Sequence, residues 1–385
     1  MSLLVINAGS SSLKFALFNL HLHEILRGRV ERIGKNSFAT ISHQKISCKA
    51  KDHLEALEFI LGEIKRRGAV NHLKDITVVS HRVVHGGTIF QGITQITPLV
   101  IKQIKSLIPL APLHNPANLT GILATQTLLP QAKQYAMFDT SFHHSIPEYA
   151  YLYGIPYETY QAQGIRKFGF HGINHEYVYH RLAYLEGRPI NIISCHLGNG
   201  SSITAIKKGK SVDTTMGYSP IDGVLMGTRS GALDPSVVLH LLAQNHFSIN
   251  EMNDFLNSQC GLKGISGVSS DLRDIYNASP TNKRAELALT MLAYSIAKFI
   301  SSFFGVLGKV DAISFSGGIG ENAYYLREAV CEHLSSFGIS IDDESNKGNK
   351  IIISRPRSTA KLYVVPAHEE FWIAKKTVEL VQAKP

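Results

Sequence analysis

The first chemical candidates in this chain are two turns rich in glycine, serine and asparagine. Small side chains in such turns let backbone N–H groups and hydroxyls approach a phosphate closely. The polar members are Asn7, Ser10, Ser12 and Lys14 in the first turn and His196, Asn199 and Gly200 in the second. Either turn alone joins two strands more often than it binds a ligand. Together they indicate phosphate binding, and because the pattern G-x-x-x-x-G-K-[ST] is absent, the cradle differs from a P-loop.

A third glycine-rich segment reads FSGGIGEN over residues 315–322, between an apolar strand and a helical tract. A turn of this kind presents backbone N–H groups at the start of a helix, where a phosphate or nucleoside can bind. The alternative is a tight connection without a ligand. Beside the two turns described above, the segment favours a nucleotide site.

Four ionisable side chains lie in segments that could present them to an anion. Arg82 in SHRVVHGG and Arg229 in MGTRSGALDP stand close to glycines, and arginine suits bidentate contact with carboxylate or phosphoryl oxygens. His171 in FGFHG and Asp139 in FDTSFHH are the other two. Singly, each has an ordinary structural explanation, such as a core histidine or a helix cap. Their joint presence favours a site that binds and transfers an anionic group.

These side chains need elements that position them, and the sequence contains the same device twice. Residues 3–17 and 192–206 each contain an apolar run, a Gly/Ser/Asn turn and a second alternating run, which predicts a β-hairpin. A hairpin repeated so far along the chain indicates two related halves, although two hairpins can also match by chance. We therefore expect two lobes with a cleft between them and a boundary near residues 148–157.

The remaining chain alternates predicted helices and strands, so the fold class is α/β. We expect strands at 76–84, 135–138, 312–315 and 362–365, helices after Pro98 and Pro116 and at 175–186, 235–244, 249–258, 283–304 and 369–381, and an exposed loop at 342–350. The two prolines fit the first turn of a helix, where their missing N–H is not needed.

Composition limits the protein class. The 385 residues are 44% hydrophobic and 18% charged, as in soluble globular proteins. The net charge of +9 is spread along the chain, which fits a small anionic ligand better than nucleic acid. The four cysteines lack disulfide or zinc spacing and fit a reducing cytoplasm. No signal peptide is expected, and the apolar tract 287–307 is expected to be a buried helix rather than a membrane span.

The motifs together closely resemble those of one family, the acetate and propionate kinases, within the superfamily of sugar kinases, Hsp70 and actin. The matching segments are LVINAGSSSLKF, SHRVVHGG, LAPLHNPANL, FDTSFHHSIPEYAYLYGIPYE, RKFGFHG, CHLGNGSSI, DTTMGYSPIDGVLMGTRSG, LDP, SSDLRDI and FSGGIGEN. These segments occur in the same order as in the family, and the resemblance extends from residue 3 to about residue 374. The resemblance implies two duplicated ribonuclease-H-like, actin-like ATPase domains, at residues 1–150 and 151–368. The C-terminal helix, residues 369–385, would pack on the first domain.

The resemblance also implies an activity and residue roles. Acetate and the γ-phosphate of ATP would meet between the lobes and give acetyl phosphate and ADP, in a reversible reaction. Arg82 and Arg229 resemble the arginines that bind the acyl group and the transferred phosphoryl group. His171 resembles a transition-state stabiliser, and Asp139 an active-site carboxylate. Asn7 and Glu369 resemble ligands of Mg²⁺, or of Mn²⁺ in its place.

Further contacts are implied for the nucleotide and the acyl group. The ATP contacts would be Ser10, Ser12, Lys14, His196, Leu197, Gly198, Asn199, Gly200, Asp271, Leu272, Arg273, Gly318, Ile319, Gly320, Glu321 and Asn322. The acyl pocket would consist of Arg82, Val84, Leu113, Phe170 and Pro220. The resemblance further implies a cytoplasmic homodimer formed through the second domain, with no nucleic-acid or membrane partner.

Elementary chemistry modifies one of these roles. Acetate has a pKa of about 4 to 4.5 and is already ionised at pH 7, so it needs no general base. We therefore expect Asp139 to orient a water bound to magnesium or an arginine. Two other readings remain, a propionate kinase of the same family and a non-catalytic nucleotide switch like actin or Hsp70. The arginine pair and His171 favour the enzyme, because a switch needs no carboxylate site.

The chain also departs from the family's usual motifs at three places. Ala232 stands where the family often has an aspartate close to Arg229. Ala367 and His368 replace a threonine and an asparagine, which changes the surroundings of the expected metal site. Ile173 and Asn174 replace a common Thr-Ser pair directly after His171 and Gly172.

Overall fold

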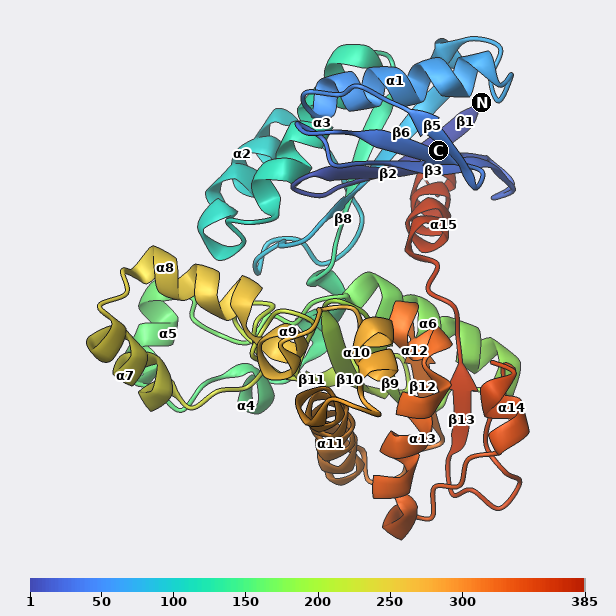
Figure 1. The fold of residues 1–385 in the computed structure, drawn as a ribbon. Helices are drawn as coiled ribbons and strands as arrows, with labels where there is room; N and C mark the ends of the chain where they lie inside the picture. Colours follow the sequence, from blue (N-terminus) through green and yellow to red (C-terminus); the bar gives the residue numbers. More distant parts are fainter. Residues whose placement is uncertain (384–385) are drawn as a thin grey trace. The chain divides into compact units, whose positions relative to one another are not determined.

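The protein is described here by a computed structural model that covers residues 1–383 (Figure 1). Residues 384–385, the end of the expected C-terminal helix, lie outside the described residues. The chain forms two compact units. Unit 1 comprises residues 1–142 and the residues from 368 onward, and unit 2 comprises residues 143–367.

Unit 1 contains an eight-stranded sheet in the order β5-β4-β3-β2-β1-β6-β8-β7. The strands are β1 Ser2–Ala8, β2 Ser12–Asn19, β3 Glu24–Glu31, β4 Phe38–Ile41, β5 Gln44–Ser47, β6 Ile76–Val83, β7 Thr94–Gln95 and β8 Lys133–Phe138. The first five strands pair as antiparallel neighbours, whereas β1, β6 and β8 run parallel. Because parallel strands end at the same edge of a sheet, the residues after Ala8, Val83 and Phe138 are brought to one edge.

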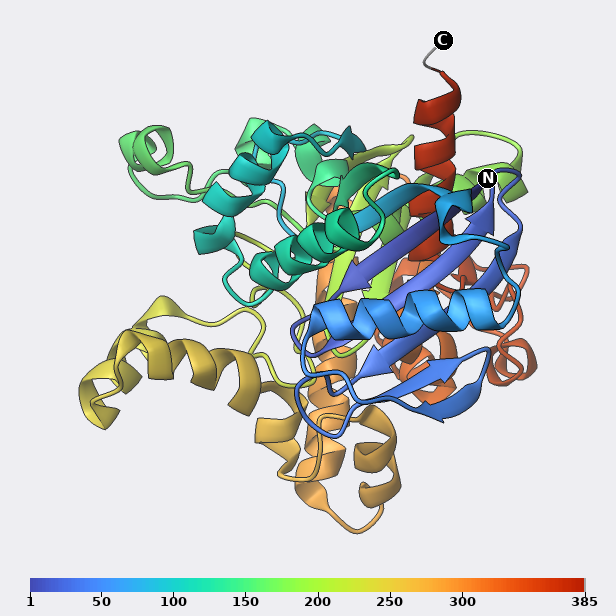
Figure 2. The same ribbon diagram turned by 90° about the horizontal axis from the view of Figure 1, so that it is seen from above.

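Helices cover both faces of this sheet. They are α1 His53–Arg66, α2 Pro98–Ser106, α3 Asn115–Leu128 and α15 Glu369–Gln382, with short 3₁₀ turns at Leu73–Asp75, Ile108–Leu110 and Ser141–Ser145. Seen from above, α1 and α3 lie side by side on one face (Figure 2). The closing helix α15 packs on the other face against β1, β2 and β6. The hydroxyl groups of its buried Thr377 and of Ser80 in β6 share a 2.7 Å hydrogen bond.

Unit 2 contains a five-stranded sheet in the order β11-β10-β9-β12-β13. Its strands are β9 Asn191–Leu197, β10 Ser201–Lys207, β11 Lys210–Thr214, β12 Ala312–Ser316 and β13 Lys361–Val364. The first three strands in sequence are antiparallel, and β9, β12 and β13 are parallel. This order matches β3-β2-β1-β6-β8 of unit 1, so both units share one topology. The predicted duplication and α/β class are confirmed, as is each predicted hairpin.

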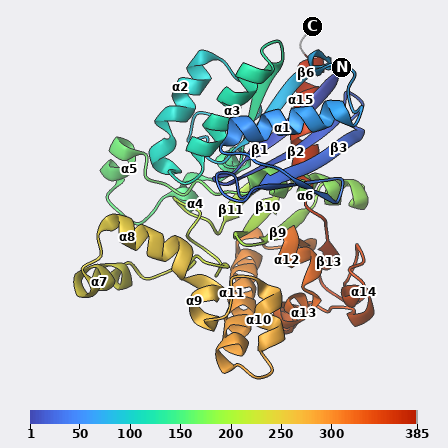
Figure 3. The same cartoon turned by 45° about the horizontal axis from the view of Figure 1, so that its top comes forward.

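Most helices of unit 2 lie around this sheet, whereas the helices within residues 235–254 project away from it (Figure 3). The helices of this unit are α4 Glu148–Tyr151, α5 Tyr157–Gln163, α6 Gly172–Glu186, α7 Pro235–Asn245, α8 Ile249–Asp254, α9 Gly261–Ser266, α10 Leu272–Ala278, α11 Lys283–Leu307, α12 Gly317–Asn322, α13 Tyr324–His333 and α14 Asp343–Lys347, with a π-helical turn at Phe255–Gln259 and a 3₁₀ turn at Ser335–Phe337. On β9, the alternating side chains Ile193, Cys195 and Leu197 join the core with α11. Ser194 and His196 instead hydrogen-bond to residues of α6, so the two helices cover opposite faces.

Two sequence expectations need correction. The segment 342–350 is not simply an exposed loop, because it contains α14, and Asn346 is 1% exposed and accepts a hydrogen bond from the buried Arg327. The apolar helix α11 is buried on one face only, since Leu287 and Tyr294 are more than half exposed. Within the described residues, α11 is the one helix with the length and apolar composition that a membrane span would need.

Candidate active site

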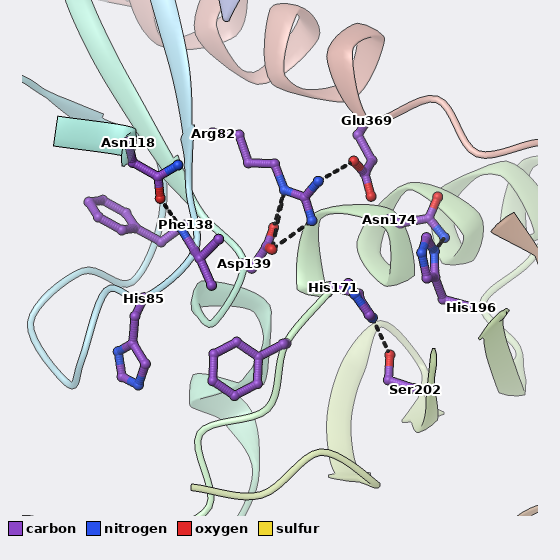
Figure 4. A network of polar contacts seen from close by, with 12 residues as sticks. Arg82, His85, Asn118, Phe138, Asp139, His171, Asn174, His196, Ser202 and Glu369 are labelled. Carbon is purple, nitrogen blue, oxygen red and sulfur yellow. Dashed lines mark hydrogen bonds and ion pairs between the residues drawn. The ribbon is translucent and has the colours of Figure 1, made fainter. Parts of the chain in front are cut away.

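The best-defined polar cluster of unit 1 joins three residues that the sequence analysis selected. Arg82 comes from the end of β6, Asp139 directly follows β8, and Glu369 is the first residue of α15 (Figure 4). The Arg82 guanidinium donates from Nη2 to Asp139 Oδ2 at 2.7 Å and from Nε to Asp139 Oδ1 at 3.0 Å. Its Nη1 donates to Glu369 Oε2 at 2.8 Å. One arginine is thus held by two carboxylates in a fixed orientation.

Burial makes this cluster electrostatically strong. The side chain of Asp139 is 2% exposed, and those of Arg82 and Glu369 are 16% and 13% exposed. Burial alone would lower the pKa of Arg82, but the charges of Asp139 and Glu369 raise it above its ordinary value. Burial raises the pKa of Asp139, and the adjacent guanidinium opposes this effect. We infer that the arginine stays charged and that Asp139 acts on it as an orienting anion.

The other predicted residues of unit 1 lie around the ends of β1 and β6. The N–H of Val84 donates to Oδ1 of Asn118 at 3.0 Å, and Asn118 Nδ2 donates to the carbonyl of Ala8 at 2.7 Å. Asn118 therefore ties the two strand ends together. It was not selected from the sequence, although it lies in the quoted segment LAPLHNPANL. Its place in this family-like segment is the signal that could have found it.

The first glycine-rich turn behaves as an ordinary hairpin turn in which Gly9 N–H donates to the carbonyl of Ser12 at 2.8 Å. Asn7 faces Lys14 in the register of β1 and β2. Lys14 lines a separate cavity of about 310 Å³ on the sheet of unit 1, together with Arg27, Arg29 and Glu370 among others. Ser10 is exposed, as is Leu113, at 47%.

In unit 2, the main cluster forms around Gly200. A Cβ atom at Gly200 would lie 3.3 Å from Arg229 Nη1, close enough to displace that side chain slightly, and 3.5 Å from His171 Cε1, an ordinary contact distance, so both side chains reach this glycine. His171 has a left-handed backbone, with φ 56° and ψ 20°, at the N-cap of α6. Such a conformation is unfavourable for a non-glycine residue and is often found at functional sites. The turn after β9 thus brings a histidine and an arginine to one place.

Arg229 is mostly buried and makes no ion pair within residues 1–383. Its Nη1 donates to the carbonyl of Pro220 at 3.1 Å. Burial lowers the pKa of Arg229, because its charged form has lost hydration without gaining a carboxylate. Ala232, where the family often has an aspartate, is consistent with this lack of a partner. A buried guanidinium without a counter-ion suits an anionic ligand.

Buried histidines and serines hold His171. Its Nδ1 lies 2.9 Å from Ser202 Oγ, which lies 2.8 Å from His175 Nε2, and His175 Nδ1 lies 2.9 Å from Ser194 Oγ. Burial lowers the pKa of His175 well below its ordinary value, so this ring is neutral at pH 7. The His196 ring packs against that of His171, with centroids 4.3 Å apart. Ser202, His175 and Ser194 were not selected from the sequence, because they lie within predicted strands and a predicted helix.

A cavity of about 580 Å³ lies where β9 and β12 end in unit 2. Eight of the predicted nucleotide contacts line it, namely Gly198, Asn199, Asp271, Leu272, Arg273, Gly318, Ile319 and Asn322. Three further lining residues, Ser270, Ala323 and Tyr325, were not predicted. The Tyr325 ring stacks on Tyr276 with centroids 3.7 Å apart, which gives the cavity a flat aromatic wall.

Several residues predicted to contact the nucleotide do not line this cavity. Leu197 and Gly320 are buried, and His196 and Gly200 belong to the cluster with His171. Glu321 accepts a 2.9 Å hydrogen bond from the N–H of Ala367. The carbonyls of Gly320 and Glu321 accept hydrogen bonds from Arg327 at 2.7 and 3.0 Å. These residues shape the end of α12 rather than the wall of the cavity.

The remaining predicted acyl and metal residues are placed as follows. Phe170 is 1% exposed in unit 2, where its carbonyl lies 3.0 Å from His143 Nε2.

Within the described residues, no group of three or more His, Cys, Asp and Glu side chains could hold a metal ion. Asn7 and Glu369 offer an amide and a carboxylate oxygen. That donor set fits Mg²⁺, which commonly uses one or two protein ligands together with waters and substrate phosphates.

Comparisons with known proteins identify the family and the fold. Residues 2–375 match the acetokinase family. An acetate kinase from Caldanaerobacter subterraneus subsp. tengcongensis is 46% identical over 399 residues, which span 99% of each chain. The crystal structure of Porphyromonas gingivalis acetate kinase is similar, with a TM-score of 0.92, 40% identity and 99% of each chain covered. A propionate kinase structure from Francisella tularensis has a TM-score of 0.93 and 38% identity, over 97% of this chain and 98% of that one. The chain therefore belongs to the acetokinase family of ATP-dependent carboxylate phosphotransferases, with the actin-like two-domain fold of that family.

Proposed function

We propose that this enzyme transfers the γ-phosphoryl group of ATP to the carboxylate of acetate, and that the reaction also runs in reverse from acetyl phosphate and ADP. The observation that carries the proposal is the convergence of Arg229 and His171 around Gly200. A buried cation without a counter-ion and a histidine donor are the groups that a phosphoryl group in transfer requires.

Each polar side chain has a role in this proposal. Arg229 and His171 stabilise the charge that develops on the equatorial phosphoryl oxygens. Arg82 binds the acyl phosphate or acetate carboxylate, and the bidentate contact with Asp139 holds its guanidinium in the binding orientation. Acetate is already ionised at neutral pH, so no residue needs to remove a proton from it. The catalysis required is positioning and charge neutralisation.

The nucleotide is proposed to occupy the 580 Å³ cavity of unit 2. A volume of this size suits a nucleoside, and the cavity combines backbone N–H groups near Gly318 with the aromatic wall of Tyr325. Asn7 and Glu369 would hold Mg²⁺. When bound, Mg²⁺ would neutralise charge on the β- and γ-phosphates.

The acyl group is proposed to contact Val84, Leu113, Phe170 and Pro220. One methylene group changes the free energy of binding in an apolar pocket by only about 1 to 3 kcal/mol, so propionate should react more slowly than acetate but measurably. Propionate kinase is the second candidate, favoured by the similarity to the Francisella tularensis structure. The two candidates differ in preference rather than in mechanism.

We further propose a cytoplasmic homodimer formed through unit 2. The apolar helix α7 supports it, because Leu239 is 67% exposed there and Ile249, the first residue of α8, is 80% exposed. Large apolar side chains that stand together in solvent commonly mark a protein interface. A second copy of the chain is the occupant that the resemblance to the family implies, and analytical ultracentrifugation of wild type and L239E tests it. A monomeric wild-type enzyme would contradict the proposal.

The central experiment is a hydroxamate assay for acyl phosphate with ATP and Mg²⁺. Acetate, propionate and butyrate are supplied in parallel, with EDTA as the metal-free control. We expect the highest kcat/KM with acetate. A higher kcat/KM with propionate would favour the second candidate, and no product from any acid would contradict a carboxylate kinase.

A further inference from the structure

Asn174 connects three segments of unit 2 that surround the proposed phosphate site. It lies in the first turn of α6, three residues after His171. Its Nδ2 donates a 2.9 Å hydrogen bond to Nδ1 of His196 at the end of β9 (Figure 4). The same Nδ2 donates a 3.1 Å hydrogen bond to Oγ of Ser316, the last residue of β12. One amide therefore links α6 to the ends of both parallel strands that lead into glycine-rich turns.

The orientation of this amide is unusual for a buried side chain. Asn174 is 0% exposed, and its Oδ1 has no hydrogen-bond partner in the described part of the chain. A buried carbonyl oxygen without a donor disfavours folding. In this orientation Nδ2 faces both Ser316 Oγ and Nδ1 of His196, so the amide presents its N–H groups to the hydroxyl and to the imidazole. The rule that buried polar atoms have hydrogen-bond partners is broken chiefly at functional sites.

The consequence concerns the proton on His196. A neutral imidazole has one N–H and one unprotonated nitrogen. Because Asn174 donates to Nδ1, that nitrogen must be the acceptor, and the ring carries its proton on Nε2. The ring also packs against His171, with centroids 4.3 Å apart. Asn174 thus fixes both the rotation and the tautomer of a side chain next to the proposed transition-state stabiliser.

We propose that Asn174 is a positioning residue for phosphoryl transfer. It holds His196 as the Nε2–H tautomer, so that this ring is a hydrogen-bond donor toward the phosphate groups of ATP. Its second hydrogen bond, to Ser316, keeps the start of α12 in register with β9. The proposal rests on the function proposed above, because it assumes that ATP phosphates bind at this edge of the sheet.

Two variants separate positioning from bulk stability. N174S removes both hydrogen bonds and installs the residue that related enzymes commonly carry at this place. N174D keeps the size but exchanges the donor for an acceptor, which draws a proton to Nδ1 of His196. The matched control is S314A on the same strand β12, because Ser314 is 0% exposed, its Oγ has no partner within the described residues, and it has no proposed role.

The first readout is the ¹⁵N NMR spectrum of histidine-labelled enzyme, with the His196 signals assigned from an H196Q sample. We expect the proton on Nε2 in the wild type and on Nδ1, or on both nitrogens, in N174D. A wild-type ring that carries its only proton on Nδ1 would overturn the proposal. This readout needs no substrate, so it is independent of the proposed activity.

The second readout is steady-state kinetics with ATP and acetate varied separately. We expect N174S to lower kcat/KM for ATP about 3- to 10-fold, as one misplaced hydrogen bond should, while KM for acetate and the thermal midpoint change little. S314A should match the wild type in both substrates. A KM for acetate that changes as much as the KM for ATP in N174S, or an unchanged kcat/KM for ATP, would contradict a positioning role. A wild type that makes no acyl phosphate would instead contradict the proposed function.

Discussion

Glu369 accepts a 2.8 Å hydrogen bond from the Arg82 guanidinium, although the two residues are 287 positions apart. The contact exists because α15 returns to the sheet of unit 1 and packs on β1 and β6. The 2.7 Å hydrogen bond between Thr377 and Ser80 anchors the same helix on β6. Helix α15 therefore supplies the third charged side chain, Glu369, to the cluster of Arg82 and Asp139 in unit 1.

Arg229→Ala should separate catalysis from folding. We expect kcat to fall at least about 10²-fold, because arginines that stabilise a phosphoryl transition state contribute about 10³- to 10⁵-fold to the rate. Stability should stay equal or rise, because the variant removes a buried charge that has no counter-ion among the described residues. The measurements are hydroxamate kinetics and urea unfolding, with Arg229→Lys as the charge-retaining control. Near-normal turnover would remove Arg229 from the mechanism.

Arg82→Ala should behave differently in the unfolding experiment. This variant leaves Asp139 and Glu369 as buried carboxylates without their cation. We expect a loss of about 3 to 5 kcal/mol in the free energy of unfolding, in addition to the loss of activity. The double variant R82M/D139L serves as control, because removing both charged partners should restore part of the stability but none of the turnover. If R82A were as stable as the wild type, the cluster would not be the buried ion pair described.

Tyr325→Ala should weaken nucleotide binding specifically. The ring lines the cavity and rests on Tyr276, so its removal takes away a preformed aromatic surface. We expect KM for ATP to rise about 5- to 150-fold, which corresponds to the roughly 1 to 3 kcal/mol typical of stacking on a base. Tyr325→Phe should retain normal values, and KM for acetate should not change. An unchanged KM for ATP in Y325A would place the base elsewhere.

Arg327→Met should disturb α12 from within the core. Within the described residues, the hydrogen bonds of this fully buried arginine go to carbonyl or amide oxygens, including those of Gly320, Glu321 and Asn346. Its loss leaves several buried acceptors without donors, each costing about 1 to 3 kcal/mol. We expect a large drop in the urea midpoint and, in the folded fraction, a raised KM for ATP. A variant with wild-type stability would contradict the role assigned to Arg327.

His81 should make stability depend on pH in the acid range. Burial lowers the pKa of His81 from 6.5 to about 4, so between these values the unfolded chain binds a proton that the native protein does not. Stability should therefore fall as the pH decreases through this window, by about 1.4 kcal/mol per pH unit for this one group. His81→Gln removes the titrating group. Urea unfolding at several pH values should show a shallower acid slope for H81Q than for the wild type, and identical slopes would refute the assignment.

The sequence by itself predicted the local elements and the residue types of the site. Hydrophobic alternation broken by glycine and serine predicted both hairpins, and their repetition predicted two units of one topology, because such patterns depend only on neighbouring residues. Gly200, Arg229 and His171 were all selected from their motifs. Their meeting around one glycine was not, since it depends on where the loop after β11 returns.

Tertiary structure alone decided the partners of these residues. Asn118, Asn174, Ser202 and Arg327 have roles that their local sequence does not predict, because a polar side chain acquires its role from the buried group that it meets. The segment 342–350 looked exposed for the same reason, since only the folded chain shows that Arg327 holds Asn346. Local sequence determines which strands and turns form. Hydrogen bonds and ion pairs between residues far apart in the chain arise only when the fold brings both partners together, and this is why only the three-dimensional structure shows them.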